Sequence, residues 1–179
     1  MAFLNESHVE EADIQFFELV LGYQHKNAWE KQLMGRDSLK NVVLKDDLRV
    51  ALKRLNPNLP HSCIEYAVEE LCKSRISMTP VMANKEVYEL IKNGVAVTFT
   101  NSEGREEIGY VKVLDFENKD NNDFLVVSQL SILYQNIGDH HDKPTRRPDL
   151  LLYINGLPLV MIELKNATEK VKIGYDKNL

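Results

Sequence analysis

The feature that most constrains the fold is a pair of apolar segments, 150–154 and 157–162, separated by Asn155-Gly156. An Asn-Gly pair between two apolar runs predicts a β-hairpin with a tight turn. Three charged residues flank the open end of this hairpin, namely Asp149, Glu163 and Lys165. Burying a carboxylate costs several kcal/mol unless it is paired or binds a metal. The sequence therefore indicates that these charged residues have a chemical role.

The register of the hairpin decides whether Asp149 lies beside Glu163. In a strand, side chains at positions i and i+2 share a face, so Glu163 and Lys165 project together. A strict two-residue turn pairs residue 149 with 162, which turns Asp149 away from Glu163. One bulge, or a three-residue connection, pairs 149 with 163 instead. Because Pro158 cannot donate a ladder hydrogen bond and favours a distorted turn, we predict the irregular register.

If these side chains converge, they suit a magnesium ion. Mg²⁺ prefers oxygen ligands, keeps several waters, and is typically held by one or two carboxylates plus substrate phosphate. The expected donors are Asp149, Glu163 and the backbone carbonyl of Leu164. The Lys165 ammonium would orient a water or stabilise negative charge on the phosphate. The pattern predicts phosphodiester hydrolysis with Mg²⁺, or with Mn²⁺ as an alternative ion.

Ahead of the hairpin the apolar periodicity is helical and then becomes strand-like. Capping boxes at Ser7 and Ser62 predict helices over about residues 8–21 and 62–71. An apolar repeat predicts a helix over about 48–55, and a cap at Asn84 predicts one over about 84–93. Residues 23–45 carry no clear pattern and are expected to be irregular. Strands are predicted over 95–100, 108–116 and 124–133, and a helix begins at about residue 168.

This order of elements predicts an α/β (α+β) fold with a mixed central β-sheet flanked by helices. The length of 179 residues suits a single domain over 1–179, with a helical part at about 8–93 and the sheet and hairpin at about 95–165. There is no signal segment and no apolar run of the roughly 18–20 residues that cross a bilayer. We therefore expect a cytoplasmic protein without a membrane partner.

Charge limits how the chain can contact DNA. A net charge of -5 argues against a surface that coats nucleic acid broadly. The one locally basic stretch lies just upstream of Asp149 and includes Lys143, Arg146 and Arg147. Any DNA contact must therefore be local, and we expect the chain alone to bind DNA weakly.

The hairpin resembles the PD-(D/E)xK nuclease superfamily, with Pro148-Asp149 and Glu163-x-Lys165 as its motif. A wider set of segments resembles the N-terminal region of the restriction (motor) subunit of type I restriction-modification enzymes, over nearly the whole chain. These segments are Val9-Glu10, Leu21-Gly22-Tyr23, Asn121-Asn122-Asp123-Phe124, Arg146-Arg147-Pro148-Asp149 and Asn155-Gly156-Leu157-Pro158-Leu159 running into Glu163-Leu164-Lys165-Asn166.

The resemblance implies a PD-(D/E)xK restriction-endonuclease-like core that acts as a type I site-specific deoxyribonuclease on duplex DNA. It implies a longer protein in which two helicase-type lobes follow and translocate DNA with ATP. No G-x-x-x-x-G-K-[ST] phosphate loop is present here, so ATP is expected to bind the full-length protein only. The implied partners are duplex DNA and the modification and specificity subunits. The piece alone is expected to be weakly active or inactive.

The resemblance also points to further site residues. Nucleases of this type often carry a glutamine after the lysine strand, and Asn178 stands at that position. A fourth acid is expected on the first helix, where Glu10 shares a face with Ile14, Phe17 and Leu21. As the third residue of a capping box, Glu10 also has a purely structural alternative. Gln129 is expected either to hydrogen-bond into the site or to lie exposed on its strand.

Contacts to the DNA backbone are predicted for basic residues on both sides of the motif. Arginine forks suit phosphate oxygens, although a solvated loop is the alternative for the stretch before Asp149. The predicted residues are Arg146, Arg147, Lys143, Lys170 and Lys172. A second functional class stays open, in which the chain keeps the fold but is a catalytically silent docking or DNA-sensing module. The intact Asp149, Glu163 and Lys165 favour the nuclease.

Overall fold

The computed structural model describes residues 6–29, 33–133 and 145–165. The chain divides into two compact units. We call residues 1–42 with 124–179 the sheet unit, and residues 43–123 the helical unit. The single domain expected over 1–179 stays a prediction. The expected helix from residue 168 lies outside the described residues, as do four candidate site residues, Lys143, Lys170, Lys172 and Asn178.

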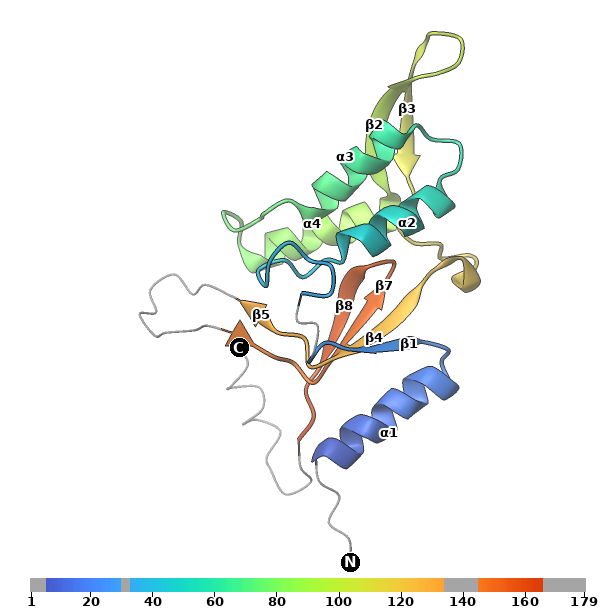
Figure 1. Cartoon of the computed structure of the whole chain (residues 1–179). Coiled ribbons are helices and arrows are strands. Elements are labelled where there is room, and N and C mark those ends of the chain that lie inside the picture. The colour runs from blue at the N-terminus through green and yellow to red at the C-terminus, as the bar shows by residue number, and fades with distance from the viewer. Residues whose placement is uncertain (1–5, 30–32, 134–144, 166–179) are drawn as a thin grey trace, which may run out of the picture. The chain divides into compact units, whose positions relative to one another are not determined.

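A four-stranded mixed sheet forms the core of the sheet unit, in the order β1-β4-β7-β8 (Figure 1). Its strands are β1 (Gln24–Asn27), β4 (Phe124–Ser128), β7 (Leu150–Ile154) and β8 (Leu157–Ile162). β1 runs parallel to β4, whereas the other neighbours are antiparallel. The mixed sheet expected from the sequence is confirmed, with helices in the same chain giving a mixed α/β architecture.

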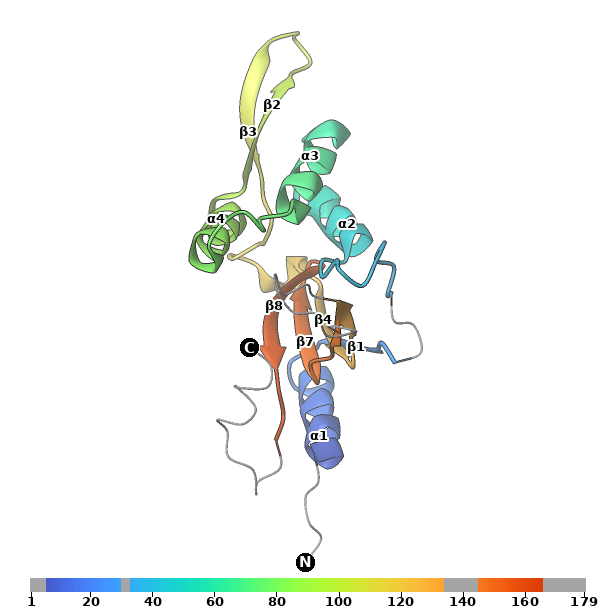
Figure 2. The same cartoon turned by 90° about the vertical axis from the view of Figure 1, so that its left-hand side faces the viewer.

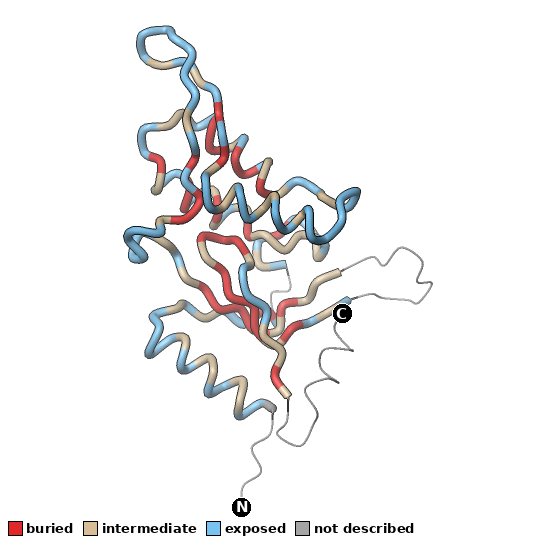
Figure 3. Tube along the Cα trace, turned by 180° about the vertical axis from the view of Figure 1, so that it is seen from behind, coloured by how far each residue is buried: buried red, intermediate tan, exposed pale blue. Residues whose placement is uncertain are grey.

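Helix α1 (Glu6–Leu19) covers one face of this sheet and confirms the first predicted helix (Figure 1). Side chains alternate along a strand, so one face of the sheet collects Val126, Leu150 and Leu152. Ile14 and Phe17 of α1 pack against these buried residues. Figure 3 shows the contrast, with buried strands in red beside a helix whose outer side is exposed. This packing fixes α1 along the strands that carry the predicted site.

β1 corrects the interpretation of residues 23–45 as irregular throughout. The strand is four polar residues long, and three of them are exposed. It pairs with β4 from Gln24 opposite Leu125 to Asn27 opposite Ser128. Backbone hydrogen bonds to a strand about one hundred residues later hold it, and no apolar alternation marks it. A sequence pattern could not predict such an edge strand, because periodicity reports burial.

The predicted strand over 124–133 is also wrong in its second half. β4 ends at Ser128, and Gln129 takes a positive φ of 59°, which is rare for a residue other than glycine. The chain then forms the short strand β5 (Ile132–Leu133), which pairs with β6 (Thr145–Arg146) in a separate two-stranded sheet. The turn at Gln129 therefore redirects the chain at the end of β4, an inner strand of the main sheet.

The helical unit contains three helices and a hairpin (Figure 2). Its elements are α2 (Lys45–Leu55), α3 (His61–Cys72), α4 (Pro80–Asn93), β2 (Val95–Thr100), β3 (Glu106–Val111) and the short 3₁₀ helix Lys119–Asn121. The apolar repeats predicted in the first two helices are buried, with Leu48 and Leu52 on α2 and Ile64 and Val68 on α3. No helix among the residues that the structure describes is long and apolar enough to cross a membrane.

Three boundaries in the helical unit differ from the sequence prediction. α3 begins at His61 after Pro60 and has no side-chain cap, so the capping box at Ser62 does not form. Thr79, rather than Asn84, caps α4, because its hydroxyl accepts a hydrogen bond from the Met82 amide at 3.3 Å. Proline directly after the cap suits the first helical turn, where no amide hydrogen is needed.

The third boundary is the end of β3, which stops at Val111 rather than continuing to residue 116. The side chain of Asn56 explains the end of β3, because it takes the hydrogen bonds that a neighbouring strand would otherwise make to Lys112. Its amide nitrogen donates to the Lys112 carbonyl at 2.9 Å, and its oxygen accepts from the Lys112 amide at 2.8 Å. A buried side chain at the end of α2 thus terminates the ladder.

Candidate functional site

The β7-β8 hairpin has the irregular register that the sequence predicts. Asn155 and Gly156 take positive φ values of 52° and 79°, as a two-residue type I′ turn requires. Near the turn, Tyr153 pairs with Pro158, but Leu152 pairs with Val160, so one extra residue sits in β8. This bulge shifts the register by one residue, so that Leu150 pairs with Ile162 at the open end. Residue 149 is thereby directed toward 163, which confirms the predicted register.

Buried polar groups anchor the hairpin from its other end. Tyr153 is fully buried, and its hydroxyl donates to the Val42 carbonyl at 3.0 Å. Burial raises the pKa of Tyr153, which keeps the hydroxyl protonated as a donor. Asn155 in the turn is also fully buried. The hairpin is therefore held at its turn, and its open end carries the charged residues.

One short hydrogen bond connects the two strands at that open end. The Asp149 carboxylate, through Oδ2, accepts from the backbone amide of Leu164 at 2.6 Å. This contact places the carboxylate against the peptide group that joins Glu163 to Leu164. Leu164 is buried, whereas Glu163 and Lys165 on either side of it are half-buried. Asp149 is therefore held next to the segment that carries Glu163 and Lys165.

Gln129 links this cluster to the first helix. Its backbone amide donates to the Asp149 carbonyl at 3.2 Å. Its side-chain amide donates to both carboxylate oxygens of Glu10, at 3.0 and 3.1 Å. The strained φ of Gln129 lets the backbone and the side chain serve these two partners at once. Hydrogen bonds thus connect four predicted site residues on α1, after β4 and at the open end of the hairpin: Glu10, Gln129, Asp149 and Leu164.

The oxygen donors at the hairpin fit a hard divalent cation. Asp149 uses one carboxylate oxygen for the Leu164 amide, and its second oxygen and the Glu163 carboxylate suit Mg²⁺, as does the Leu164 carbonyl. Among the described residues, no three acids, histidines or cysteines form a group that could hold a metal. Two carboxylates are enough for Mg²⁺, which keeps several waters and takes the rest of its shell from substrate.

The basic residues before Asp149 lie in different surroundings. Arg146 is half-buried in β6, opposite Ile132 of β5. Arg147 is exposed, and its guanidinium carbon lies 4.4 Å from the centre of the Trp29 ring. The two neighbouring arginines therefore differ in their surroundings. Arg146 belongs to a strand, whereas Arg147 stacks on the Trp29 ring two residues before Asp149.

Comparison with known protein families gives the family of this chain. The model for the type I restriction enzyme R protein N terminus (HSDR_N) matches residues 3–178. The chain belongs to this family. The resemblance stated from the motif segments is confirmed, and the hairpin at residues 149–165 lies well inside the matched region.

The chain is similar to endonuclease subunits of type I restriction enzymes. The chain is 35% identical, over 91% of its length, to the type I restriction enzyme HindI endonuclease subunit of Haemophilus influenzae. It is 34% identical, again over 91% of its length, to the putative type I restriction enzyme MjaIXP endonuclease subunit of Methanocaldococcus jannaschii. The chain spans 15% of the length of each of these two relatives.

Two neighbours of the site were missed by the sequence analysis. The His25 ring nitrogen Nε2 lies 2.9 Å from the hydroxyl of Ser128, which is fully buried. Trp29 follows β1, and its indole ring contacts the guanidinium group of Arg147. Both belong to the segment that was expected to be irregular, so their approach to β4 and to the loop before β7 had no sequence signal.

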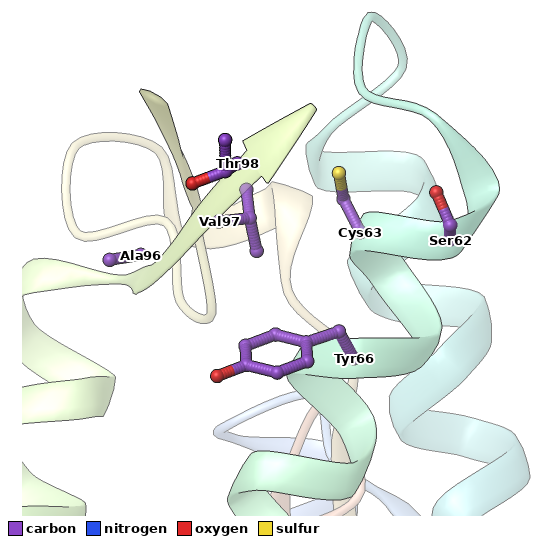
Figure 4. Close-up of a pocket in the computed structure, with 6 residues that line it drawn as sticks. All are labelled: Ser62, Cys63, Tyr66, Ala96, Val97 and Thr98. Atoms are coloured by element: carbon purple, nitrogen blue, oxygen red, sulfur yellow. The ribbon is translucent and has the colours of Figure 1, made fainter. Parts of the chain in front are cut away.

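A separate hollow of about 350 Å³ lies in the helical unit, between α3 and β2 (Figure 4). Ser62, Cys63 and Tyr66 line it from α3, and Ala96, Val97 and Thr98 line it from β2. The predicted site residues of this family member belong to the sheet unit and do not line it. None of these six lining residues carries a charged side chain.

Replacing Gln129 with alanine tests the link between the helix and the hairpin. We expect Gln129→Ala to leave the Glu10 carboxylate without its amide partner and to lower the free energy of unfolding by about 1–2 kcal/mol. Chemical denaturation measures this. Gln129→Glu is the matched variant, because it keeps the size of the side chain but replaces donor with acceptor opposite Glu10, and we expect it to destabilise at least as much. Equal stability of both variants and the unaltered chain would contradict the link.

Proposed function

We propose that this chain is the magnesium-dependent endonuclease region of a type I restriction enzyme subunit and hydrolyses phosphodiester bonds of duplex DNA. The observation that carries the proposal is the hydrogen bond of 2.6 Å between the Asp149 carboxylate and the Leu164 amide. With the bulged register of the hairpin, it supports a position of the Asp149 carboxylate near Glu163 and Lys165. This is the combination of two acids and a lysine that metal-assisted phosphodiester cleavage uses.

In this proposal Asp149, Glu163 and the Leu164 carbonyl hold the cation. Bound Mg²⁺ supplies a Lewis acid that favours ionisation of water and stabilises negative charge on the phosphate. The Leu164 amide, by donating to one Asp149 oxygen, fixes the rotation of the carboxylate and leaves the other oxygen oriented. A donor set held before substrate arrives needs little reorganisation, which favours catalysis by preorganisation.

Lys165 provides the remaining charge. β8 ends at Ile162, but the buried Leu164 lies between the half-buried Glu163 and Lys165, and this alternation supports a common side for the Lys165 ammonium and the Glu163 carboxylate. There it would orient the attacking water or stabilise the charge that develops on the phosphate oxygens. Gln129 acts one step away, because it ties the Asp149 backbone to Glu10 on α1 and so supports the position of the first acid.

The wider activity belongs to the longer protein in this proposal. ATP-driven translocation of duplex DNA would be carried out by further domains, and target choice by modification and specificity subunits. DNA would therefore be delivered to the hairpin rather than captured by it. The net charge of -5 agrees with weak DNA binding by this chain alone, because few phosphate contacts are available.

Metal binding by the 179-residue chain tests the proposal. Titration with Mn²⁺, followed by electron paramagnetic resonance, is expected to show a site that Asp149→Asn and Glu163→Gln each weaken by at least about tenfold. Asparagine keeps an acceptor for the Leu164 amide, so the hairpin is retained. Glu69→Gln, at an exposed position on α3, is the control and should bind as the unaltered chain does. Equal Mn²⁺ binding by all variants would favour the catalytically silent docking module instead.

A further inference from the structure

The contact between Trp29 and Arg147 joins residues that are more than one hundred positions apart. The guanidinium carbon of Arg147 lies 4.4 Å from the centre of the indole ring, a distance typical of a cation–π stack. Trp29 is 58% exposed and is the single tryptophan of the chain. The stack therefore lies on the surface and has one face toward solvent.

Backbone contacts place this stack at the site end of the sheet. β1 runs parallel to β4 and ends at Asn27, opposite Ser128. The Ala28 amide then donates to the Ser128 carbonyl at 2.9 Å, so Trp29 follows β1 at the same end of the sheet where Gln129 follows β4. Gln129 in turn donates to the Asp149 carbonyl at 3.2 Å. The ring thus lies at the strand ends that also carry the candidate acids.

The distance along the chain is short enough for both groups to contact one DNA strand. Arg147 and Asp149 are two residues apart, so their Cα atoms are separated by at most about 7 Å. Successive phosphates of one DNA strand advance by about 3.4 Å along the helix axis. Arg147 and Asp149 are therefore close enough for both to contact the same stretch of one DNA strand.

The chemistry of the stack suits a phosphate. A guanidinium that lies on an aromatic face keeps its N–H groups directed outward in one plane, where they can donate to two phosphate oxygens. Stacking restricts the rotation of a long side chain, so less entropy is lost when the phosphate binds. Among the residues that the structure describes, no carboxylate forms an ion pair with Arg147.

We propose that Trp29 and Arg147 form a phosphate-holding pair that grips the DNA backbone beside the phosphodiester bond to be cut. Arg147 makes the contact, and Trp29 is a positioning residue that acts through the guanidinium. The proposal rests on the proposed nuclease function and adds a named substrate contact to it. It also assigns a role to Trp29, which no sequence motif marks.

The fluorescence of Trp29 tests the proposal directly, because no other tryptophan contributes. A short blunt duplex, added with Ca²⁺ in place of Mg²⁺ to prevent cutting, is expected to change the emission of the 179-residue chain in a saturable manner at about 1–100 µM duplex. Inorganic phosphate at the same phosphate concentration is expected to cause no saturable change. Unchanged emission with the duplex, or an equal response to inorganic phosphate, would overturn the proposal.

Variants separate the two residues. With a labelled duplex and anisotropy, Arg147→Ala should bind about tenfold more weakly and should reduce the slope of log affinity against log salt by about 0.9, the loss of one phosphate contact. Trp29→Leu should weaken binding by about threefold, and Trp29→Phe should restore most of the loss because it keeps an aromatic face. Arg105→Ala, at an exposed position of the helical unit, is the control and should bind normally.

Mn²⁺ binding keeps this proposal distinct from the nuclease proposal. Arg147→Ala and Trp29→Leu should bind Mn²⁺ as the unaltered chain does, since neither carries a donor. If these variants bind DNA normally while Asp149→Asn loses Mn²⁺, the phosphate-holding pair is refuted and the nuclease proposal stands. If they lose DNA affinity and salt dependence while Asp149→Asn keeps Mn²⁺, the pair stands as a DNA contact and the metal site is refuted.

Discussion

Replacing Lys165 with alanine in the longer protein, assembled with its partner subunits, is expected to abolish DNA cleavage and to leave ATP-driven translocation intact. Lys165 follows the buried Leu164, three residues after the end of β8, next to the peptide group that Asp149 accepts from. Removing a preorganised positive group that stabilises transition-state charge costs about 10²–10³-fold in rate. Cleavage of circular duplex DNA measures the first quantity, and displacement of a bound oligonucleotide along the track measures the second.

Two further variants sharpen this test. Lys165→Arg keeps the positive charge but replaces a compact ammonium with a planar fork, so we expect only part of the activity to remain. Lys85→Ala removes an exposed lysine from α4 in the helical unit and should cleave as the unaltered protein does. Loss of translocation together with cleavage in Lys165→Ala would indicate a structural role for the lysine. Undiminished cleavage would remove it from the proposed chemistry.

The hairpin could be predicted from sequence because its determinants are local. The Asn155-Gly156 turn, the apolar flanks and Pro158 all act within a few residues, and together they specify both the turn and the bulge. The burial of Leu164 between the half-buried Glu163 and Lys165 follows the alternation expected for a strand, although β8 itself ends at Ile162. The motif, its register and the family could therefore be predicted before any coordinates.

The supports of the site depend on long-range contacts and could not be predicted in the same way. β1 is four polar residues whose partner lies in β4, and its pairing is made by the backbone. Nothing in the residues around Gln129 predicts its positive φ, which arises where the chain leaves the sheet and serves Glu10 and Asp149 together. Trp29 is placed by the same strand. Sequence periodicity reports burial, whereas these contacts are made by polar or exposed residues in the edge strand β1 and just beyond the strand ends.

The largest expected effect on stability is at Arg36, which lies in the segment 23–45 that was expected from the sequence to be irregular. Arg36 is 4% exposed, and burial lowers the pKa of its guanidinium. Nε donates to the Leu33 carbonyl at 2.9 Å, Nη1 to the Asn41 carbonyl at 2.8 Å, and Nη2 to the Ser131 carbonyl at 3.0 Å. One side chain thus joins the loop after β1 to the segment that follows Gln129.

Arg36→Met is expected to lower the free energy of unfolding by about 3–5 kcal/mol, because it leaves three carbonyl groups without their donor in a buried site. Arg36→Lys should recover only part of this, since one ammonium cannot reproduce a planar fork that serves three acceptors. Denaturation in urea measures both. Arg105→Met, which removes an exposed arginine, should stay within about 0.5 kcal/mol of the unaltered chain.

The Arg36 variants also connect stability to the site. Ser131 lies two residues after Gln129, so loss of the Arg36 contact loosens the segment that positions the Asp149 carbonyl. We therefore expect Arg36→Lys, under conditions where it remains folded, to weaken Mn²⁺ binding severalfold although it lies outside the donor set. A variant that is destabilised but binds Mn²⁺ normally would show that the hairpin holds Asp149 through the Leu164 amide alone. In that case the turn at Gln129 contributes to the fold and not to the metal site.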